Sequence, residues 1–226
     1  MKRIYALIAV LCLLLAGCGE TPSNIEHTSN DHPETTTTAK PQVAVTQDWL
    51  SPADEYSWER TEKITHIVVH FISAVNVDAN DPYNYQTIRQ IFVDGKVSAH
   101  YLLDREGRAT ALVAEDRAAW HAGKGSWGND ERYTNAMNKY SIGIEIMNIG
   151  TFADMEQYLT RAEYDALDQS LIGFTDAQYQ TLGALIDELC ARYGIPKDRE
   201  HILGHQEYNP LKSDPGEGFD WSKIGL

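Results

Sequence analysis

Two apolar stretches far apart in the chain constrain its fold most, because each has the composition of a strand inside a sheet. ITHIVVHF at residues 64–71 is apolar and β-branched at odd and even positions alike, which is typical of a central strand covered on both faces. SIGIEIMNIG at residues 141–150 alternates isoleucine with smaller or polar residues, so one face is apolar and the other, which includes Glu145, is polar. Together they predict a buried sheet.

Helical patterns separate these strands. The clearest one begins with the capping-box pair Thr175 and Gln178, continues with apolar residues at helical spacing and ends at Gly194. Further helices are predicted at about 84–94 and 160–170, and a hairpin of two strands at 98–104 and 108–113. This alternation predicts a single α/β domain over residues 49–226, with a mixed central β-sheet flanked by helices.

Residues 1–17 have the pattern of an export signal. Lys2 and Arg3 precede thirteen uncharged residues, which are too few to span a bilayer. The run ends in LAGC and resembles the bacterial lipoprotein signal, in which the chain is cut before the cysteine and the thiol of Cys18 is lipidated. A plain signal peptide with an incidental Cys18 is the alternative. We expect a membrane-anchored lipoprotein of the cell envelope, on the periplasmic face of the outer membrane if the host has one.

Residues 18–48 are predicted to be a flexible tether, because they are rich in Thr, Pro, Asn and Ser and contain few large apolar residues. The formal net charge is −14, and it becomes −16 once Lys2 and Arg3 leave with the signal, which contains no acidic residue. A chain this acidic is a poor partner for nucleic acid, so we exclude nucleic acid as a ligand. Cys190 lies on the apolar stripe of the 175–193 helix and is predicted to be a buried structural thiol.

The stretch GHQEYNPLKSDPG at 204–216 carries more chemistry than a structural loop needs. Catalytic zinc sites use three protein ligands, usually histidine, acidic or cysteine side chains. His205 and Asp214 from this stretch, with His70 at the end of the first strand, would supply two imidazoles and one carboxylate. Such a set predicts a Zn²⁺ ion that activates water and polarises a carbonyl group.

Two further residues have predicted catalytic roles. Glu145 is a carboxylate on a strand face, where burial is costly unless the group is solvated or functional, so we predict a general base. Gly143 beside it would leave room for substrate. Lys212, two residues before Asp214, would carry positive charge toward the oxygen on which negative charge develops.

Six motifs in order carry a resemblance to a known family: IVVH, SAHYLLDREG, AWHAG, NKYSIGIE, TDAQYQTL and GHQEYNPLKSDPGEGFDW. Over residues 60–222 the chain resembles the zinc-dependent N-acetylmuramoyl-L-alanine amidases of the bacteriophage T7 lysozyme type, amidase type 2, which include the peptidoglycan recognition proteins. The resemblance implies a mixed sheet with zinc in a surface groove. It matches His70, His205 and Asp214 to the metal ligands, and it matches Glu145 and Lys212 to the catalytic carboxylate and lysine.

Two departures from the family pattern bear on the chemistry. Asp214 stands where some relatives have a cysteine ligand. This chain has Ala99 before His100, where T7 lysozyme has a tyrosine. Because a catalytic tyrosine is not available there, catalysis depends more on Glu145. The irregular stretch at 121–140 is predicted to form the rim of a cleft. Within it, His121 and Asn138 either contact the sugar or peptide of a substrate or hold the loop.

The resemblance implies hydrolysis of the amide bond between the lactyl group of N-acetylmuramic acid and L-alanine, in peptidoglycan or muropeptides. We expect a monomer. Two alternatives remain open: a peptidoglycan-binding receptor without activity, and a metallopeptidase that cuts within the stem peptide. His66 and His201 are predicted to be structural or surface residues, because histidines four apart in a strand lie roughly 13 Å apart. The absence of an H-E-x-x-H motif argues against a thermolysin-like protease.

Overall fold

The structure, a computed structural model, describes residues 42–226. The predicted signal peptide, the lipidation site Cys18 and most of the predicted tether lie outside the described residues, so these stay predictions. Within residues 42–226, none of the helices combines the length and the apolar character that crossing a bilayer requires.

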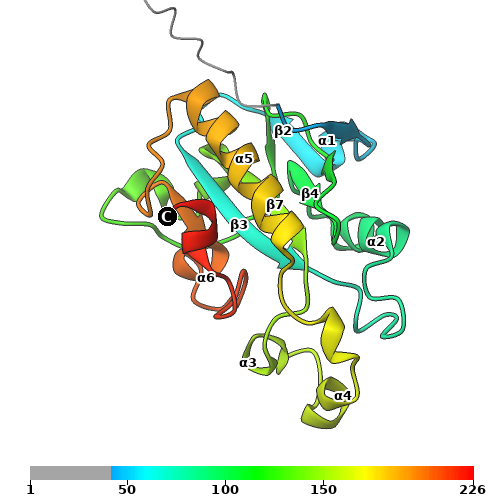
Figure 1. Cartoon of the computed structure of the whole chain (residues 1–226). Helices are drawn as coiled ribbons and strands as arrows, with labels where there is room; N and C mark the ends of the chain where they lie inside the picture. The colour runs from blue at the N-terminus through cyan, green and yellow to red at the C-terminus, as the bar shows by residue number, and fades with distance from the viewer. Residues whose placement is uncertain (1–41) are drawn as a thin grey trace, which may run out of the picture. The chain divides into compact units, whose positions relative to one another are not determined.

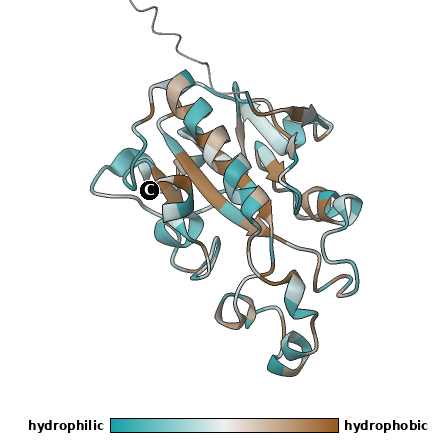
Figure 2. Cartoon of the chain, viewed as in Figure 1, coloured by the Kyte–Doolittle hydropathy of each residue, from teal (hydrophilic) through white to brown (hydrophobic). Residues whose placement is uncertain are grey.

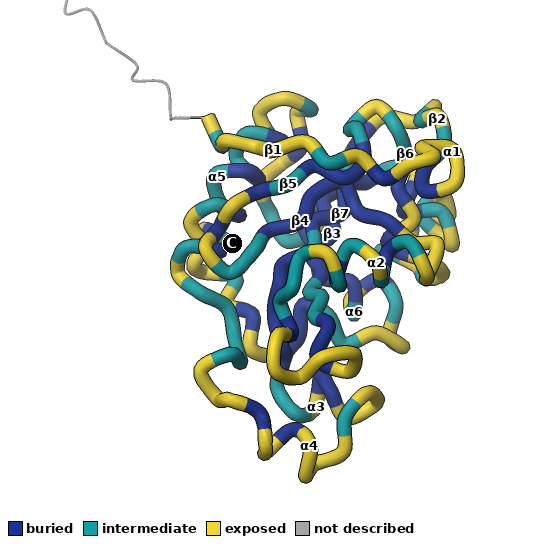
Figure 3. Tube along the Cα trace, turned by 90° about the vertical axis from the view of Figure 1, so that its right-hand side faces the viewer, coloured by how far each residue is buried: buried dark blue, intermediate teal, exposed yellow. Residues whose placement is uncertain are grey.

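Six strands form one mixed sheet in the order β1-β5-β4-β7-β3-β8, and Figure 3 shows β1, β5 and β4 next to one another. All neighbouring pairs are parallel except β4 and β5, which form the predicted hairpin. The two apolar stretches occupy the middle of the sheet as β7 and β3, so the predicted mixed α/β fold is confirmed. The strands are β1 (Val45–Gln47), β3 (His66–Ile72), β4 (Tyr101–Leu103), β5 (Ala109–Ala111), β7 (Ser141–Met147) and β8 (Ile202–Gly204).

Helix α5 (Asp176–Tyr193) covers one face of the sheet and crosses in front of β3 and β7 in Figure 1. Its predicted capping box is present, and its C-cap, Gly194, has the left-handed conformation that ends many helices. Leu182, Leu185 and Ile186 of α5 form one buried cluster with the isoleucines of β7 and with alternate residues of β3. In Figure 2 the brown, apolar course of β3 runs behind this helix. This face holds the main core.

The opposite face is covered in two parts. Helix α2 (Tyr85–Gly95), at the predicted position, packs Ile88 and Phe92 against Leu102 and Met147. Beside it, the irregular 121–140 stretch packs on Val68 of β3 together with Tyr208. Since Val68 and His70 are two residues apart in one strand, they share a face, and the candidate site lies on this side. The remaining helices are α1 (Ala53–Tyr56), α3 (Phe152–Met155), α4 (Arg161–Asp165) and α6 (His205–Tyr208).

The structure corrects three details. Strand β1 pairs with β5 inside the segment predicted as tether, so the ordered sheet begins before residue 49. The pattern at 160–170 gives two short pieces, α4 and a 3₁₀ turn at Gln169–Leu171, because the side chain of Asp168 caps the backbone N–H of Ser170 and starts a new turn. Strands β2 (Ser57–Glu59) and β6 (Arg117–Ala119) form a separate antiparallel pair that the sequence reading missed.

Candidate metal centre and active site

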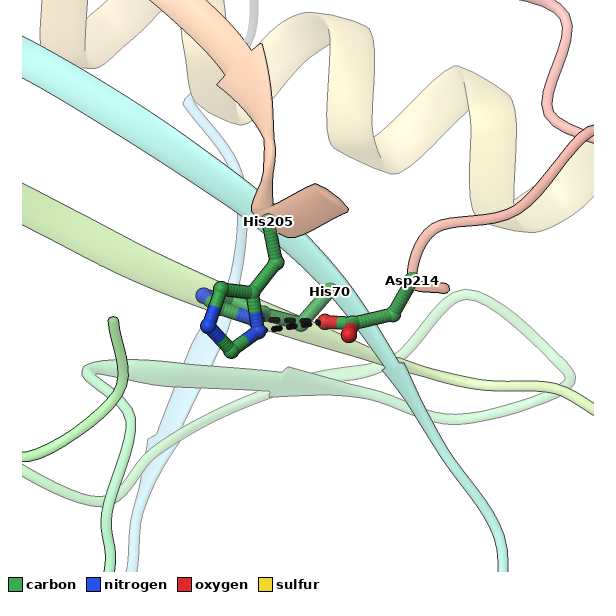
Figure 4. Close-up of side chains that lie close together, drawn as sticks. All are labelled: His70, His205 and Asp214. Carbon is green, nitrogen blue, oxygen red and sulfur yellow. Dashed lines mark hydrogen bonds and ion pairs between the residues drawn. The ribbon is translucent and has the colours of Figure 1, made fainter. Parts of the chain in front are cut away.

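The structure brings together the three predicted metal ligands (Figure 4). Strand β3 pairs with β8 so that Val69 lies opposite Gly204, which places His70 beside His205 at the start of α6. The Nδ1 atoms of the two histidines lie 3.1 Å apart. The Oδ2 atom of Asp214 lies 2.7 Å from Nδ1 of His70 and 3.0 Å from Nδ1 of His205. Three potential donor atoms thus face one point.

The chemistry of this donor set fits a divalent cation. Burial, reinforced by the neighbouring His205, lowers the pKa of His70 to about 4, so its imidazole is neutral at pH 7. Burial acts to raise the pKa of Asp214, but the close approach of its carboxylate to the rings of His205 and His70 outweighs burial and holds that pKa well below its usual range. A neutral imidazole and an ionised carboxylate are the forms that bind zinc. The part of the chain that the structure describes contains one such group of histidine and acidic side chains.

The loop that carries Asp214 is tied down on both sides. The backbone N–H of Gln206 donates to the carbonyl of Asp214 at 2.9 Å. The hydroxyl of Ser213 donates to the carbonyl of Asp154 in α3 at 2.9 Å. Asp154 is buried and closes a capping box with Thr151. The sequence reading did not identify Asp154, although the T-x-x-D pattern at 151–154 is the usual signal for a helix start.

Glu145 lies on β7 directly opposite His70 of β3, so both side chains emerge on the same face of the sheet. Its Oε2 atom is buried and has no hydrogen-bond partner among residues 42–226. Burial and the negative charge of Asp214 raise the pKa of Glu145 well above its usual range, and the charge of Lys212 opposes them. A buried carboxyl group with an unpaired oxygen beside a candidate metal centre is suited to carry a proton.

Lys212 has an exposed side chain on the loop before Asp214. Its positive charge acts on two groups of the site, since it lowers the pKa of both His70 and Glu145. The lysine therefore adds positive potential to the opening of the site, as its predicted role requires.

His121 and Asn138 have other contacts than the predicted contacts with substrate. The ring of His121 is buried, with Nδ1 3.1 Å from Nε2 of His70 and Nε2 3.1 Å from the hydroxyl of Ser141. Oδ1 of Asn138 accepts the backbone N–H groups of His121 and Ala122 at 3.2 and 2.7 Å. Both side chains are committed to the interior, so of the two expected roles the structure favours holding the loop.

Gly143 does not leave the room for substrate that was predicted for it. A Cβ atom at this position would lie 2.5 Å from Cγ of His121, so the space above the glycine is filled by that ring and not left for substrate. The backbone N–H of Gly143 donates to Nδ1 of His100 at 3.0 Å. His100 is completely buried, and burial together with the charge of Arg60 lowers its pKa to about 3. His100 is thus a neutral structural residue.

Arg60 is a structural residue that the sequence reading missed. Its guanidinium donates to the backbone carbonyls of Lys139, Arg117 and Ser141 at 2.7, 2.8 and 3.0 Å. These bonds join β6 and the end of the irregular stretch to the start of β7. Nothing in the sequence around Arg60 distinguishes it from a surface arginine. The predicted structural assignment of His66 and His201 agrees with their contacts, since their rings stack on each other at 5.5 Å between centroids.

A cavity of about 240 Å³ lies directly beside the metal cluster and includes Asp214 in its wall. The cavity is bounded mainly by apolar side chains, with a few polar groups. Its other walls come from the end of β3 and the loop after it, from Ile91 of α2, from Met155 and Tyr158, and from Ser213. A larger cavity of about 690 Å³ lies around residues 60–65 and 192–196 and shares no lining residue with the ligand set. The smaller cavity is therefore the candidate substrate site.

Comparison with known proteins agrees with this geometry. The model of the family described as N-acetylmuramoyl-L-alanine amidase matches residues 60–217. The 1,6-anhydro-N-acetylmuramyl-L-alanine amidase AmpD of Citrobacter freundii is 36% identical over 130 residues, which are 57% of this chain and 56% of the relative. The chain thus spans a little over half the length of such relatives. AmpD of Enterobacter cloacae is 32% identical over 176 residues, 72% of this chain and 80% of the relative.

Solved structures give the same result. A selenomethionine derivative of AmpD superimposes with a TM-score of 0.55 at 29% identity, covering 80% of this chain and 92% of the other. The amidase AmiD from Escherichia coli, in complex with anhydro-N-acetylmuramic acid-L-Ala-D-γ-Glu-L-Lys, superimposes with a TM-score of 0.52 at 28% identity, covering 72% of this chain and 56% of the other. By the match over residues 60–217 and these likenesses in sequence and fold, the chain belongs to the N-acetylmuramoyl-L-alanine amidase family.

Proposed function

We propose that this protein is a zinc-dependent N-acetylmuramoyl-L-alanine amidase that cuts the amide bond between the lactyl group of N-acetylmuramic acid and L-alanine. The observation that carries the proposal is the convergence of His70, His205 and Asp214 beside the buried carboxyl group of Glu145. Family membership supports the reaction class. AmpD relatives bear the name of this activity, and the AmiD complex holds a muropeptide of this kind.

The three ligands would hold the ion through Nδ1 of His70, Nδ1 of His205 and Oδ2 of Asp214. Bound there, Zn²⁺ supplies a Lewis acid that polarises a carbonyl oxygen and lowers the pKa of water. Glu145 accepts the proton of the attacking water and holds it until the C–N bond breaks. It then donates the proton to the leaving amino group of L-alanine. Lys212 stabilises the negative charge that develops on the carbonyl oxygen.

The substrate class we propose is a muropeptide or the peptidoglycan from which it comes. The candidate cavity suits such a ligand, because its apolar walls can pack against the lactyl and alanyl methyl groups while a few polar groups orient the amide. We also propose that Cys18 carries a lipid and that residues 19–41 link the domain to a membrane. An enzyme on a tether can reach an insoluble polymer close to that membrane. Replacement Cys18→Ser would then move the protein from the membrane fraction to the soluble fraction.

The test is digestion of purified peptidoglycan and of defined anhydro and reducing muropeptides, with and without a zinc chelator. We expect new L-alanine amino termini and free glycan, identified by labelling and mass, and we expect the chelator to abolish them. Cleavage within the stem peptide would instead identify a peptidase. Tight binding of muropeptide without any cleavage, whether or not zinc is added, would identify a receptor and contradict the proposal.

A further inference from the structure

The two histidines of the proposed metal centre share one orientation. Each points Nδ1 toward Asp214 and its other ring nitrogen, Nε2, away from the centre. On that outer side, Nε2 of His70 lies 3.1 Å from Nδ1 of His121, and Nε2 of His205 lies 2.9 Å from the carbonyl oxygen of Ala122. Two consecutive residues therefore contact both histidines from behind.

The carbonyl of Ala122 fixes the position of one proton. A carbonyl oxygen can only accept, so Nε2 of His205 must carry a hydrogen to bond it. A neutral imidazole has one N–H, and its presence on Nε2 leaves the lone pair on Nδ1, the atom that faces the ligand set. The backbone of Ala122 thus selects the tautomer of His205 that can bind a metal through Nδ1.

A chain of hydrogen bonds makes the same selection for His70. The hydroxyl of Ser141 lies 2.7 Å from the carbonyl of Met137, which can only accept, so Ser141 donates to it. The oxygen of Ser141 is then free to accept from Nε2 of His121 at 3.1 Å. With its hydrogen on Nε2, His121 presents an unprotonated Nδ1 to His70, and His70 donates from its own Nε2. In each hydrogen bond of this series, the donor lies nearer to the metal centre than the acceptor does.

The segment that makes these contacts is held rigidly. Oδ1 of Asn138 accepts the backbone N–H groups of both His121 and Ala122. The ring of His121 lies so close to β7 that only a glycine at position 143 leaves room for it. The supporting segment is thus fixed in position and in tautomer.

We infer that His121 and Ala122, held by Asn138, are positioning residues that set the tautomer and orientation of both metal-binding histidines. This inference rests on the proposed metal centre and adds to it a reason for the irregular stretch at 121–140. Groups that bond the outer nitrogen of a metal-binding histidine typically contribute a factor of about 10–100 to metal affinity. Loss of His121 should therefore weaken zinc binding even though His121 does not touch the ion.

The first experiment measures the dissociation constant of Zn²⁺ for the full chain by competition with a chromophoric chelator. We expect His121→Leu to raise this constant about 10- to 100-fold. His121→Gln should recover most of the loss, because the amide oxygen can accept from His70 and the amide N–H can donate to Ser141. His66→Leu is the matched control: it removes another buried histidine of the same face, and it should leave the zinc constant unchanged.

The second experiment reads the tautomers directly, by two-dimensional ¹H–¹⁵N correlation of histidine rings in the zinc-loaded protein. His121 should show a protonated Nε2 and an unprotonated Nδ1. Ser141→Ala should shift or broaden these ring signals, since it removes the acceptor of the His121 N–H. If His121→Leu does not fold, the glutamine variant and this spectrum decide the matter.

The outcomes separate this inference from the proposed function. A chain that binds no zinc at all would refute the metal centre itself. Wild-type zinc affinity in His121→Leu, an equal loss in His66→Leu, or a His121 ring protonated on Nδ1 would overturn the positioning role while leaving the amidase proposal in place.

Discussion

At the scale of single residues, Glu145 stands out because the fold buries its Oε2 atom without giving it a hydrogen-bond partner among the described residues. An unpaired buried polar atom costs free energy, so a structural role for this side chain is hard to support. A proton-transfer role explains both its burial and its position opposite His70. A carboxyl group whose pKa is shifted far from its usual value, next to a candidate metal centre, is typical of functional sites.

Replacement Glu145→Gln keeps the shape of the side chain and removes its ability to take up a proton. We expect amide hydrolysis to fall by about 10²- to 10⁴-fold. The dissociation constant of zinc should stay close to that of the wild type, because Glu145 is not in the ligand set. Release of L-alanine-bearing peptide from a muropeptide measures the first quantity, and chelator competition the second. Full activity with zinc bound would show that another group moves the proton.

His100 gives a prediction about pH. Its pKa of about 3 lies below the ordinary value of 6.5, so the unfolded chain binds a proton that the folded chain rejects, and stability falls as pH decreases from 6.5 toward 3. Between pH 8 and pH 5 this one residue accounts for a loss of roughly 2 kcal/mol. His100→Gln can still accept from Gly143 and donate to Arg117 but cannot titrate. When the pH is lowered from 8 to 5, the free energy of unfolding of this variant, measured in urea, should therefore fall by roughly 2 kcal/mol less than that of the wild type. An unchanged pH dependence would contradict the buried neutral state.

At the scale of elements, length and periodicity decide what the sequence reveals. Strands β3 and β7 and helix α5 are long enough to show their patterns, and they were predicted. Strands β1, β2 and β6 have three residues each, too few for any period to emerge, and they lack the turn that joins the equally short β4 and β5 into a recognisable hairpin. Their place is decided by pairing with distant partners, which local sequence does not encode. The interruption between α4 and the following 3₁₀ turn was missed for a similar reason, since a single capping side chain outweighs a continuous apolar pattern.

The contact between β7 and the irregular stretch can be tested with two glycines. Gly143→Ala places a Cβ atom 2.5 Å from the ring of His121, so the ring must move away from His70. We expect weaker zinc binding and a lower melting temperature. Gly183→Ala in α5 is the matched control, because the nearest atom to its Cβ lies at 3.7 Å, an ordinary contact. That change should stabilise the fold by roughly 0.5–1 kcal/mol and leave zinc binding unchanged. Chemical denaturation and chelator competition measure both effects.

At the scale of the whole molecule, most of the candidate site could be predicted because its ligands have distinctive chemistry and stand in recognisable motifs. His70, His205, Asp214 and Glu145 meet as expected once β3, β7 and β8 are adjacent. The contacts of His121 could not be predicted, since they depend on which nitrogen faces which neighbour. That information exists only in the packed structure.

The ligand set links parts of the fold that local structure does not connect, so metal binding should stabilise the whole domain. Zinc at about 1,000 times its dissociation constant should raise the free energy of unfolding by about 4 kcal/mol, because the ion binds the folded state. Calorimetry of the protein with added zinc and with chelator measures this difference. His205→Ala should abolish most of the gain. A melting temperature that zinc does not change would contradict a folded-state metal site.

The separation of the ligands along the chain has a consequence for biogenesis. Nδ1 of His70 and Oδ2 of Asp214 lie 2.7 Å apart although 144 positions separate the two residues, and β8 must join the sheet before they meet. A polypeptide that crosses a membrane amino-terminus first would deliver the early histidine long before its partners. Under the proposed activity and the proposed export, the capacity to cut peptidoglycan would therefore arise only in molecules that have crossed the membrane as far as Asp214, and an export intermediate stalled earlier would lack the complete ligand set.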